Sequence, residues 1–183
     1  RDPAFTNILF VGRLDPRNAP WVLRLIERFL GEKPFREGIH RYVHRFRFGN
    51  AAGHDLWRSL AAVCKSPIEP LMDSWINQPG FPLVHAESRV KAGRNEITLK
   101  QQRFSAGPRD HRRSDDNHWQ IPVVVAFARG KRREEACFLL DKPQATVKLP
   151  GRGAVRWWFP NADAAGFFRV ALDEATLTRL LED

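Results

Sequence analysis

Two histidines stand at positions where they could share a metal ion. His40 and His44 lie four residues apart in the stretch IHRYVHRF, residues 39–46. On an α-helix this spacing places both imidazoles on one face, where they can bind one zinc ion. The stretch therefore raises the hypothesis of a zinc-dependent hydrolytic centre.

The neighbouring residues do not complete such a centre. A zinc-hydrolase helix of this type carries a Glu directly after its first His, as the base that takes a proton from zinc-bound water. Arg41 occupies that position, and a permanent cation repels the metal. A third protein ligand is also required, and the next predicted helix offers no carboxylate around SLAAVCK, residues 59–65. We interpret both histidines as surface groups beside an Arg-rich helix face.

The sequence likewise gives no support for nucleophilic catalysis or for a phosphate-binding loop. Cys64 and Cys137 are far apart and form no metal-ligand pattern, which favours buried thiols in a reducing compartment, and no GxSxG elbow is present. Asp115 and Asp116 fall in the polar stretch 107–118, which we predict to be an exposed, mobile loop. GRGAV, residues 151–155, lacks the pattern of a phosphate loop and predicts a turn between strands.

The formal charge of +9 admits a nucleic acid, an anionic membrane or an acidic protein as a partner. Basic and aromatic residues alternate in 40–50 and 155–160, but Tyr42 and Phe46 are spaced for burial in a helix. The Trp157–Trp158 pair favours a role in the core or at a domain interface. Nucleic-acid binding is therefore disfavoured. No apolar run reaches membrane-spanning length, so we expect no membrane span.

Residues 1–80 have helical periodicity and predict the first domain. Helices are expected within 20–35, 33–46, 53–65 and 66–77, with Gly31 as a stop signal and Pro67 near a first turn. The side chains predicted to turn inward are Val22, Leu25, Ile26, Phe29, Leu30, Phe35, Ile39, Tyr42, Val43, Phe46, Leu56, Trp57, Leu60, Val63, Leu71, Met72, Trp75 and Ile76.

Residues 81–183 change to a period of two and predict the second domain, an antiparallel β-sandwich. The strand segments are 83–90, 95–104, 119–130, 134–141, 145–150 and 166–173, with a hairpin tip at 130–135. The last residues read as the start of a helix and the first residue is not Met, so we expect a piece of a larger protein. The predicted fold class is α+β.

The junction between the two domains resembles a known family. GNAAGHDLWRSL and IEPLMDSWINQPGFPLV are similar to the corresponding stretches of the aminopeptidase N-like zinc metallopeptidases, the gluzincin aminopeptidases. The residues that carry this resemblance are Asn50, Ala51, Asp55, Leu56, Trp57, Met72, Trp75, Gln78, Gly80 and Pro82. Independently of the family, Trp57 and Trp75 are expected to anchor adjacent helices, and PGFP to force a sharp exit from helix to strand.

The resemblance extends to both sides of the junction. Upstream, residues 22–43 look like the helix pair that precedes it in the family. Downstream, residues 97–104, 119–127 and 161–173 look like the family's β-sandwich domain. In the last of these stretches the matching residues are Gly166, Phe167, Arg169, Val170 and Asp173. Nearly the whole chain is covered.

The resemblance implies a fragment: the C-terminal helices of a thermolysin-like catalytic domain, followed by the β-sandwich domain. In the family the zinc ligands lie upstream of this region, and a catalytic Tyr that stabilises the oxyanion falls just before the helix matching WVLRLIERF. Here that region reads ILFVGRLDPRNAP, and Phe10 or Pro16 would occupy the Tyr position. The parent is then a divergent aminopeptidase or a member that has lost catalysis and kept the scaffold.

We therefore expect no catalytic, cofactor-binding or metal-ligating residue within this chain. Zinc is expected in the full-length parent, whose implied reaction removes N-terminal residues from peptides with a zinc-activated water. The expected partners are the remainder of the catalytic domain and a following helical domain, and the expected location is cytoplasmic. The alternative function is a catalytically inactive interaction module that binds a protein or polyanion through a basic face.

Overall fold

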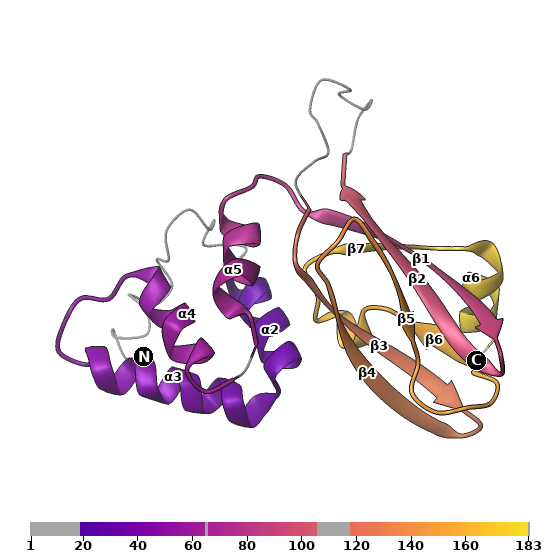
Figure 1. Cartoon of the computed structure of the whole chain (residues 1–183), viewed down its shortest axis with the longest axis horizontal. Helices are drawn as coiled ribbons and strands as arrows, with labels where there is room; N and C mark the ends of the chain where they lie inside the picture. Colours follow the sequence, from indigo (N-terminus) through magenta and orange to yellow (C-terminus); the bar gives the residue numbers. More distant parts are fainter. Residues whose placement is uncertain (1–18, 65, 106–117, 183) are drawn as a thin grey trace. The chain divides into compact units, whose positions relative to one another are not determined.

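The computed structural model describes residues 19–64, 66–105 and 118–182. The chain divides into two compact units, Arg1–Pro79 and Gly80–Asp183. In the described residues the first unit is helical, and the second consists of two β-sheets with a short final helix (Figure 1). The fold is α+β, with helices followed by a β-sandwich, as predicted.

Amphipathic periodicity explains the helices of the first unit. They are α2 (Ala19–Leu30), α3 (Glu32–Phe46), α4 (Gly53–Ala61) and α5 (Ile68–Ile76). Gly31, at φ 83°, adopts the left-handed conformation that ends a helix, so α2 stops where the sequence predicts. The fully apolar positions that these helices bury are Val22, Leu25, Ile26, Leu56, Trp57, Leu60, Ile68, Leu71, Met72 and Trp75.

Helices α3 and α4 approach each other closely at one glycine. A Cβ atom added to Gly38 would lie 2.7 Å from Leu60 Cδ2 and 3.0 Å from the backbone Cα of Leu60. Real Cβ atoms are excluded from such distances, so only glycine allows this approach. Gly38 is accordingly buried in the middle of α3.

The predicted inward orientation of Val43 is wrong. Its side chain is 38% exposed, whereas the neighbouring Tyr42 is buried. The buried face of α3 is centred on Gly38 and Tyr42. Val43 lies one residue past Tyr42, which on an α-helix is about 100° around the axis, and this places it at the margin of the packed face.

The second unit contains a four-stranded and a three-stranded sheet among its described residues. The first sheet has the order β5-β2-β1-β7, and the second has the order β4-β3-β6. The strands are β1 (Pro82–Lys91), β2 (Arg94–Arg103), β3 (Ile121–Arg129), β4 (Arg132–Leu140), β5 (Gln144–Lys148), β6 (Trp157–Phe159) and β7 (Arg169–Leu172). The β3–β4 hairpin turns at Gly130 and Lys131, inside the predicted tip.

The core of the sandwich lies between alternating apolar side chains of the two sheets. Strand β3 is buried along almost its whole length, with Val123, Val125 and Phe127 fully shielded from solvent. Val84, Ile97 and Leu99 of the other sheet are equally buried. Alternation is seen in part of β1, whereas β3 is buried on both faces because Val124 and Ala126 pack with Ala162 and Trp157 on its other side.

The sandwich differs from the purely antiparallel prediction in one pairing. Strands β1 and β7 are parallel, with Leu83 opposite Arg169 and Ala86 opposite Leu172. A parallel pair requires a long connection, and here almost the whole unit separates the two strands in sequence.

The segment around the Trp pair forms an element that the periodicity did not reveal. Trp157–Phe159 is a strand, β6, which pairs with β3 and directs Trp158 into the core at 4% exposure. A short 3₁₀ turn, η1 (Ala162–Ala164), precedes β7, and α6 (Glu174–Leu181) follows it. The predicted start of a helix at the end of the sequence is thus observed.

Candidate functional site

His40 and His44 lie on the exposed face of α3, as predicted. Their rings are stacked with centroids 6.2 Å apart. Arg41, between them in sequence, donates from Nη2 to Glu37 Oε1 at 2.9 Å and forms an exposed ion pair one helical turn back. The residue that would have to be a general base is therefore a guanidinium held by a carboxylate.

These histidines do not fit a catalytic zinc site. Such a site requires three protein ligands. Within the part of the chain that the structure describes, no group of three or more His, Cys, Asp or Glu side chains could hold a metal ion. The two imidazoles also face solvent beside Arg41 and Arg45, and nearby positive charge opposes cation binding.

Tyr42, the one tyrosine of the sequence, is part of the helical core. Its ring packs on Phe46 with centroids 5.4 Å apart. Burial, followed by the negative charge of Asp55, raises the pKa of the Tyr42 phenol above its ordinary value. The phenol therefore stays protonated within the packed helices. Phe10 and Pro16, the two candidates for the family's catalytic Tyr position, lie outside the described residues.

Within the described residues, neither cysteine belongs to a nucleophilic centre. Cys64 is partly buried, and its Sγ donates to the carbonyl of Leu60 at 2.7 Å. Burial raises the pKa of the Cys64 thiol, which keeps it in the unreactive protonated form. The prediction of a buried thiol is wrong for Cys137, which is exposed because its side chain lies on an outward-facing position of β4. Asp115 and Asp116 lie outside the described residues.

In the helical unit, the residues that carry the family resemblance stabilise the fold. Asp55 Oδ2 accepts from the backbone N–H of Ala52 at 2.9 Å, which caps the start of α4. Trp57 and Trp75 are buried at 5% and 7% exposure on helices α4 and α5, which pack together. These contacts are the helix anchors that the sequence predicted.

The exit from helix to strand depends on Gly80 and Pro82. Gly80 has φ 90°, a conformation that other residues rarely adopt. Pro82 is the first residue of β1, where a missing N–H costs no ladder hydrogen bond. PGFP therefore ends the helical segment and starts the sheet, as predicted.

The second set of motif residues fixes the corner of the sandwich before β7. A Cβ atom on Gly166 would clash with Phe168 Cε1 and would lie 2.9 Å from Asn161 Oδ1. Asn161 uses the space: its Oδ1 accepts from the Gly166 N–H at 2.7 Å, and its Nδ2 donates to the Gly166 carbonyl at 3.1 Å. The Gly166 position is thus dictated by packing.

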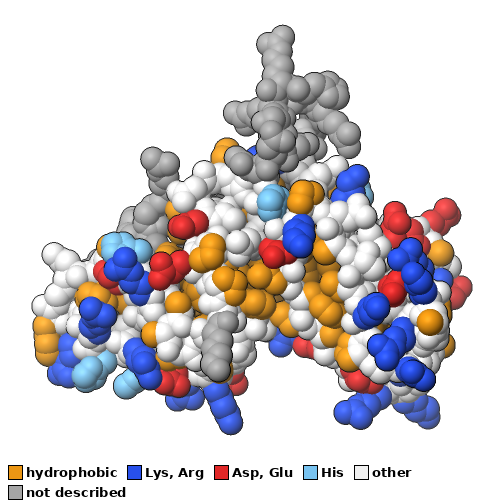
Figure 2. Space-filling model, in the orientation of Figure 1, with side chains coloured by type: hydrophobic (Ala, Val, Ile, Leu, Met, Phe, Trp, Pro, Cys, Tyr) orange, Lys and Arg blue, Asp and Glu red, His pale blue; other side chains and the backbone are white. Residues whose placement is uncertain are grey.

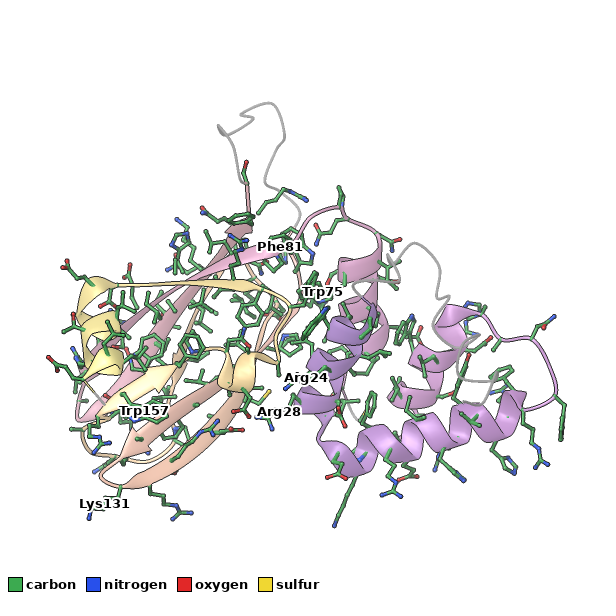
Figure 3. All side chains as sticks on the ribbon, turned by 180° about the vertical axis from the view of Figure 1, so that it is seen from behind. Arg24, Arg28, Trp75, Phe81, Lys131 and Trp157 are labelled. Carbon is green, nitrogen blue, oxygen red and sulfur yellow. The ribbon has the colours of Figure 1, made fainter. Side chains whose placement is uncertain are left out.

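Arg169 and Asp173 extend this corner. The Arg169 guanidinium lies 4.0 Å from the ring centroid of Phe104, which stacks on Phe81 at 5.0 Å (Phe81 is labelled in Figure 3). This cation–π contact ties β7 to the end of β2 and the start of β1. Asp173 caps α6, because its Oδ1 accepts from the Thr176 N–H at 2.8 Å.

Gln101 is a central residue that the sequence analysis did not single out. It lies on β2, in the core, at 7% exposure. Its Nε2 donates to the carbonyls of Trp119 and Lys142 at 2.8 and 2.9 Å, and its Oε1 accepts from the Trp119 N–H at 2.8 Å. A signal did exist, because Gln101 continues the inward series of Ile97 and Leu99.

Two further predictions can be compared with the structure. Residues 151–155 are irregular, with Gly151 at φ 80° and Gly153 at φ 98°, which agrees with the predicted turn. The described helices are all too short or too polar to cross a bilayer.

Comparison with known proteins identifies relatives over most of the chain. Residues 18–75 match the Peptidase family M1 domain. The chain is 32% identical over 163 residues to the puromycin-sensitive aminopeptidase of Caenorhabditis elegans, which covers 88% of this chain and 17% of the relative. It is 43% identical over 149 residues to a leucyl aminopeptidase of Saccharolobus solfataricus, covering 81% of this chain and 17% of the relative.

A third relative, the tricorn protease-interacting factor F2 of Thermoplasma acidophilum, is 32% identical over 165 residues, or 88% of this chain and 18% of the relative. Each alignment is longer than either unit and therefore includes parts of both. The chain spans about one sixth of the length of these relatives. The predicted resemblance to the aminopeptidase N-like metallopeptidases is confirmed: the peptidase family M1 model matches within the first unit, and the alignments with aminopeptidases extend over most of the chain.

Proposed function

We propose that this chain is a non-catalytic scaffold segment of a zinc-dependent aminopeptidase-like protein. In this proposal residues 1–80 form the last helices of a thermolysin-like catalytic domain, and residues 81–183 form the β-sandwich that follows it. The segment would form one side of the catalytic domain and would separate that domain from a following helical domain. The alignments support the proposal because they include both units in one chain.

The observation that carries the proposal is the role of the motif residues. Asp55 and Asp173 cap helices, Trp57 and Trp75 fill the helical core, and Gly166 leaves room for Phe168. Each of these contacts stabilises the fold. The residues through which the chain resembles a peptidase thus have architectural roles, as a scaffold segment requires.

The proposed reaction of the parent is the removal of N-terminal residues from peptides by a zinc-activated water. The curated relatives named aminopeptidases support this assignment. The zinc ligands would lie in a part of the parent that this sequence does not contain. Phe10 or Pro16 at the catalytic Tyr position favours either a divergent aminopeptidase or a parent that has lost catalysis. The spacing of Cys64 and Cys137 supports a cytoplasmic location.

The test is an aminopeptidase assay on a longer protein that contains this chain. Fluorogenic aminoacyl amides would be supplied with and without a zinc chelator, and activity would be restored by added Zn²⁺. Chelator-sensitive turnover is the expected result for an active parent. The contrary result is a longer protein that has a complete set of zinc ligands and binds zinc but shows no turnover. That result would overturn the enzymatic assignment, and only the scaffold role would remain.

A second candidate function is an interaction module that binds an acidic partner through a basic face. The exposed side of α3 favours it, because five basic side chains share that side.

A further inference from the structure

The exposed side of α3 carries a continuous row of basic side chains. Lys33, Arg36, His40, His44 and Arg47 follow one another at intervals of three or four residues, and all five are exposed. This spacing keeps them on one face of the helix. We call these five residues the α3 basic row. Figure 2 shows blue and pale-blue side chains gathered along the lower edge of the helical unit, over α3.

The basic row is not needed for packing. The buried residues of α3 are Gly38 and Tyr42, with Phe35 and Phe46 partly buried beside them. They occupy the opposite side of the helix, which packs on α4. The row is about 21 Å long at 1.5 Å per residue. Four of its side chains project from a helix whose opposite side is packed, and Arg47 directly follows that helix.

The positive charge of the row is not neutralised within the described residues. Two carboxylates of α3 lie near the row: Glu37 is paired with Arg41 at 2.9 Å, and Glu32 is adjacent in sequence to Lys33 and four residues before Arg36. No ion pair among the described residues involves Lys33, Arg36 or Arg47. Arginine and lysine remain charged at physiological pH. The row therefore carries three permanent positive charges, on Lys33, Arg36 and Arg47, with the carboxylate of Glu32 near its first end.

We propose that the α3 basic row binds an acidic helical segment of a partner protein. Carboxylates one turn apart on a straight acidic helix repeat at the same interval as Arg36, His40 and His44, so the two helices can pair along their length. This inference deepens the second candidate function and does not depend on the scaffold role.

The structure favours an acidic helix over two other polyanions. Single-stranded nucleic acids are bound on series of aromatic platforms, whereas Tyr42 and Phe46 lie on the packed side of α3. One exposed phenyl ring, Phe48 at 89% exposure, follows the row, with the Arg47 guanidinium 4.4 Å from its centroid, so the described residues offer a single platform there and not a series. A helix that binds a membrane surface inserts its apolar face, and the apolar face of α3 is packed inside the unit.

The test is binding of a fluorescent helical peptide with Glu at every fourth position to the whole chain, measured by anisotropy at low and physiological salt. We expect the double substitution Arg36→Glu with Arg47→Glu to weaken binding about tenfold. The matched control is Lys131→Glu with Arg132→Glu, which makes the same charge change at the exposed β3–β4 tip, where Figure 3 labels Lys131. This control should leave the affinity within about twofold.

Three results would overturn the proposal. One is equal loss in both double variants, which would indicate a general charge effect. Another is that an oligo-dT strand or phosphatidylserine vesicles bind more tightly than the peptide, and that only the α3 double variant loses this binding. The third is no binding of the peptide at low salt. Circular dichroism checks that each variant is folded, and Arg36→Gln with Arg47→Gln repeats the measurement without introducing repulsion.

Discussion

At the scale of single residues, close contacts explain positions that look unremarkable in the sequence. Gly38 lies in the middle of a helix, where glycine is ordinarily unfavourable. The structure shows why it is there: α4 passes so near that Leu60 occupies the space of a side chain. The same reasoning applies to Gly166 beside Phe168. At both positions, close packing of a neighbouring side chain requires a residue without a Cβ atom.

We predict that Gly38→Ala destabilises the helical unit by about 1–3 kcal/mol, because the new methyl group must displace Leu60. In an exposed helix the same change would stabilise by about 1 kcal/mol. Urea unfolding followed by circular dichroism measures the difference. Gly49→Ala is the control, because nothing lies within 4 Å of the Cβ position of Gly49. A Gly38→Ala protein as stable as the wild type would contradict the packing.

The reactivities of the two cysteines should differ in a pH-dependent way. Burial raises the pKa of the Cys64 thiol, so little thiolate exists at neutral pH. We predict that iodoacetamide modifies the exposed Cys137 first at pH 7.5. The alkylation rate of Cys64 should still be rising with pH beyond the ordinary range for a thiol. Intact-mass spectrometry with Cys64→Ser and Cys137→Ser variants assigns the sites, and faster modification of Cys64 at pH 7.5 would be the opposite result.

At the scale of elements, one polar side chain connects the two sheets through hydrogen bonds. Gln101 bonds across the core to the backbone at Trp119, just before β3, and to the loop that follows β4. An amide that satisfies several buried backbone groups can be replaced only at the cost of leaving them unpaired.

We predict that Gln101→Leu destabilises the sandwich by about 2–4 kcal/mol, although the substitution adds apolar character to the core. The reason is that the Trp119 N–H loses its acceptor and two carbonyls lose a donor. Thermal unfolding provides the measurement. Gln102→Leu, on the other side of the same strand, should change the stability by less than about 0.5 kcal/mol. If both variants unfold at the same temperature, Gln101 does not have this role.

The elements also show what the sequence could and could not predict. Long periodic segments such as 20–30 and 119–129 were assigned correctly because burial imposes its period on them. The three-residue strand β6 is too short to show a period. The β1–β7 pairing joins Leu83 to Arg169, and no local pattern records which distant strand is a partner. The exposure of Val43 depends on where α4 touches α3, which is tertiary information.

At the scale of the whole molecule, the chain combines two compact units, and the alignments with its relatives extend over parts of both. Its relatives include both units, yet the chain spans about one sixth of their length. The absence of a zinc motif in the sequence was predictable from Arg41, and the peptidase relationship from the junction residues Trp57 and Gly80.

The most direct measurement of the central claim is zinc content and hydrolysis on the purified 183-residue chain. Metal content by mass spectrometry and turnover of leucyl and alanyl fluorogenic amides would be recorded on the same sample, with and without added Zn²⁺. The scaffold proposal predicts zinc well below one equivalent and turnover equal to the buffer blank, because no described residue completes a three-ligand metal site with His40 and His44. Stoichiometric zinc together with chelator-sensitive turnover by this chain would contradict it.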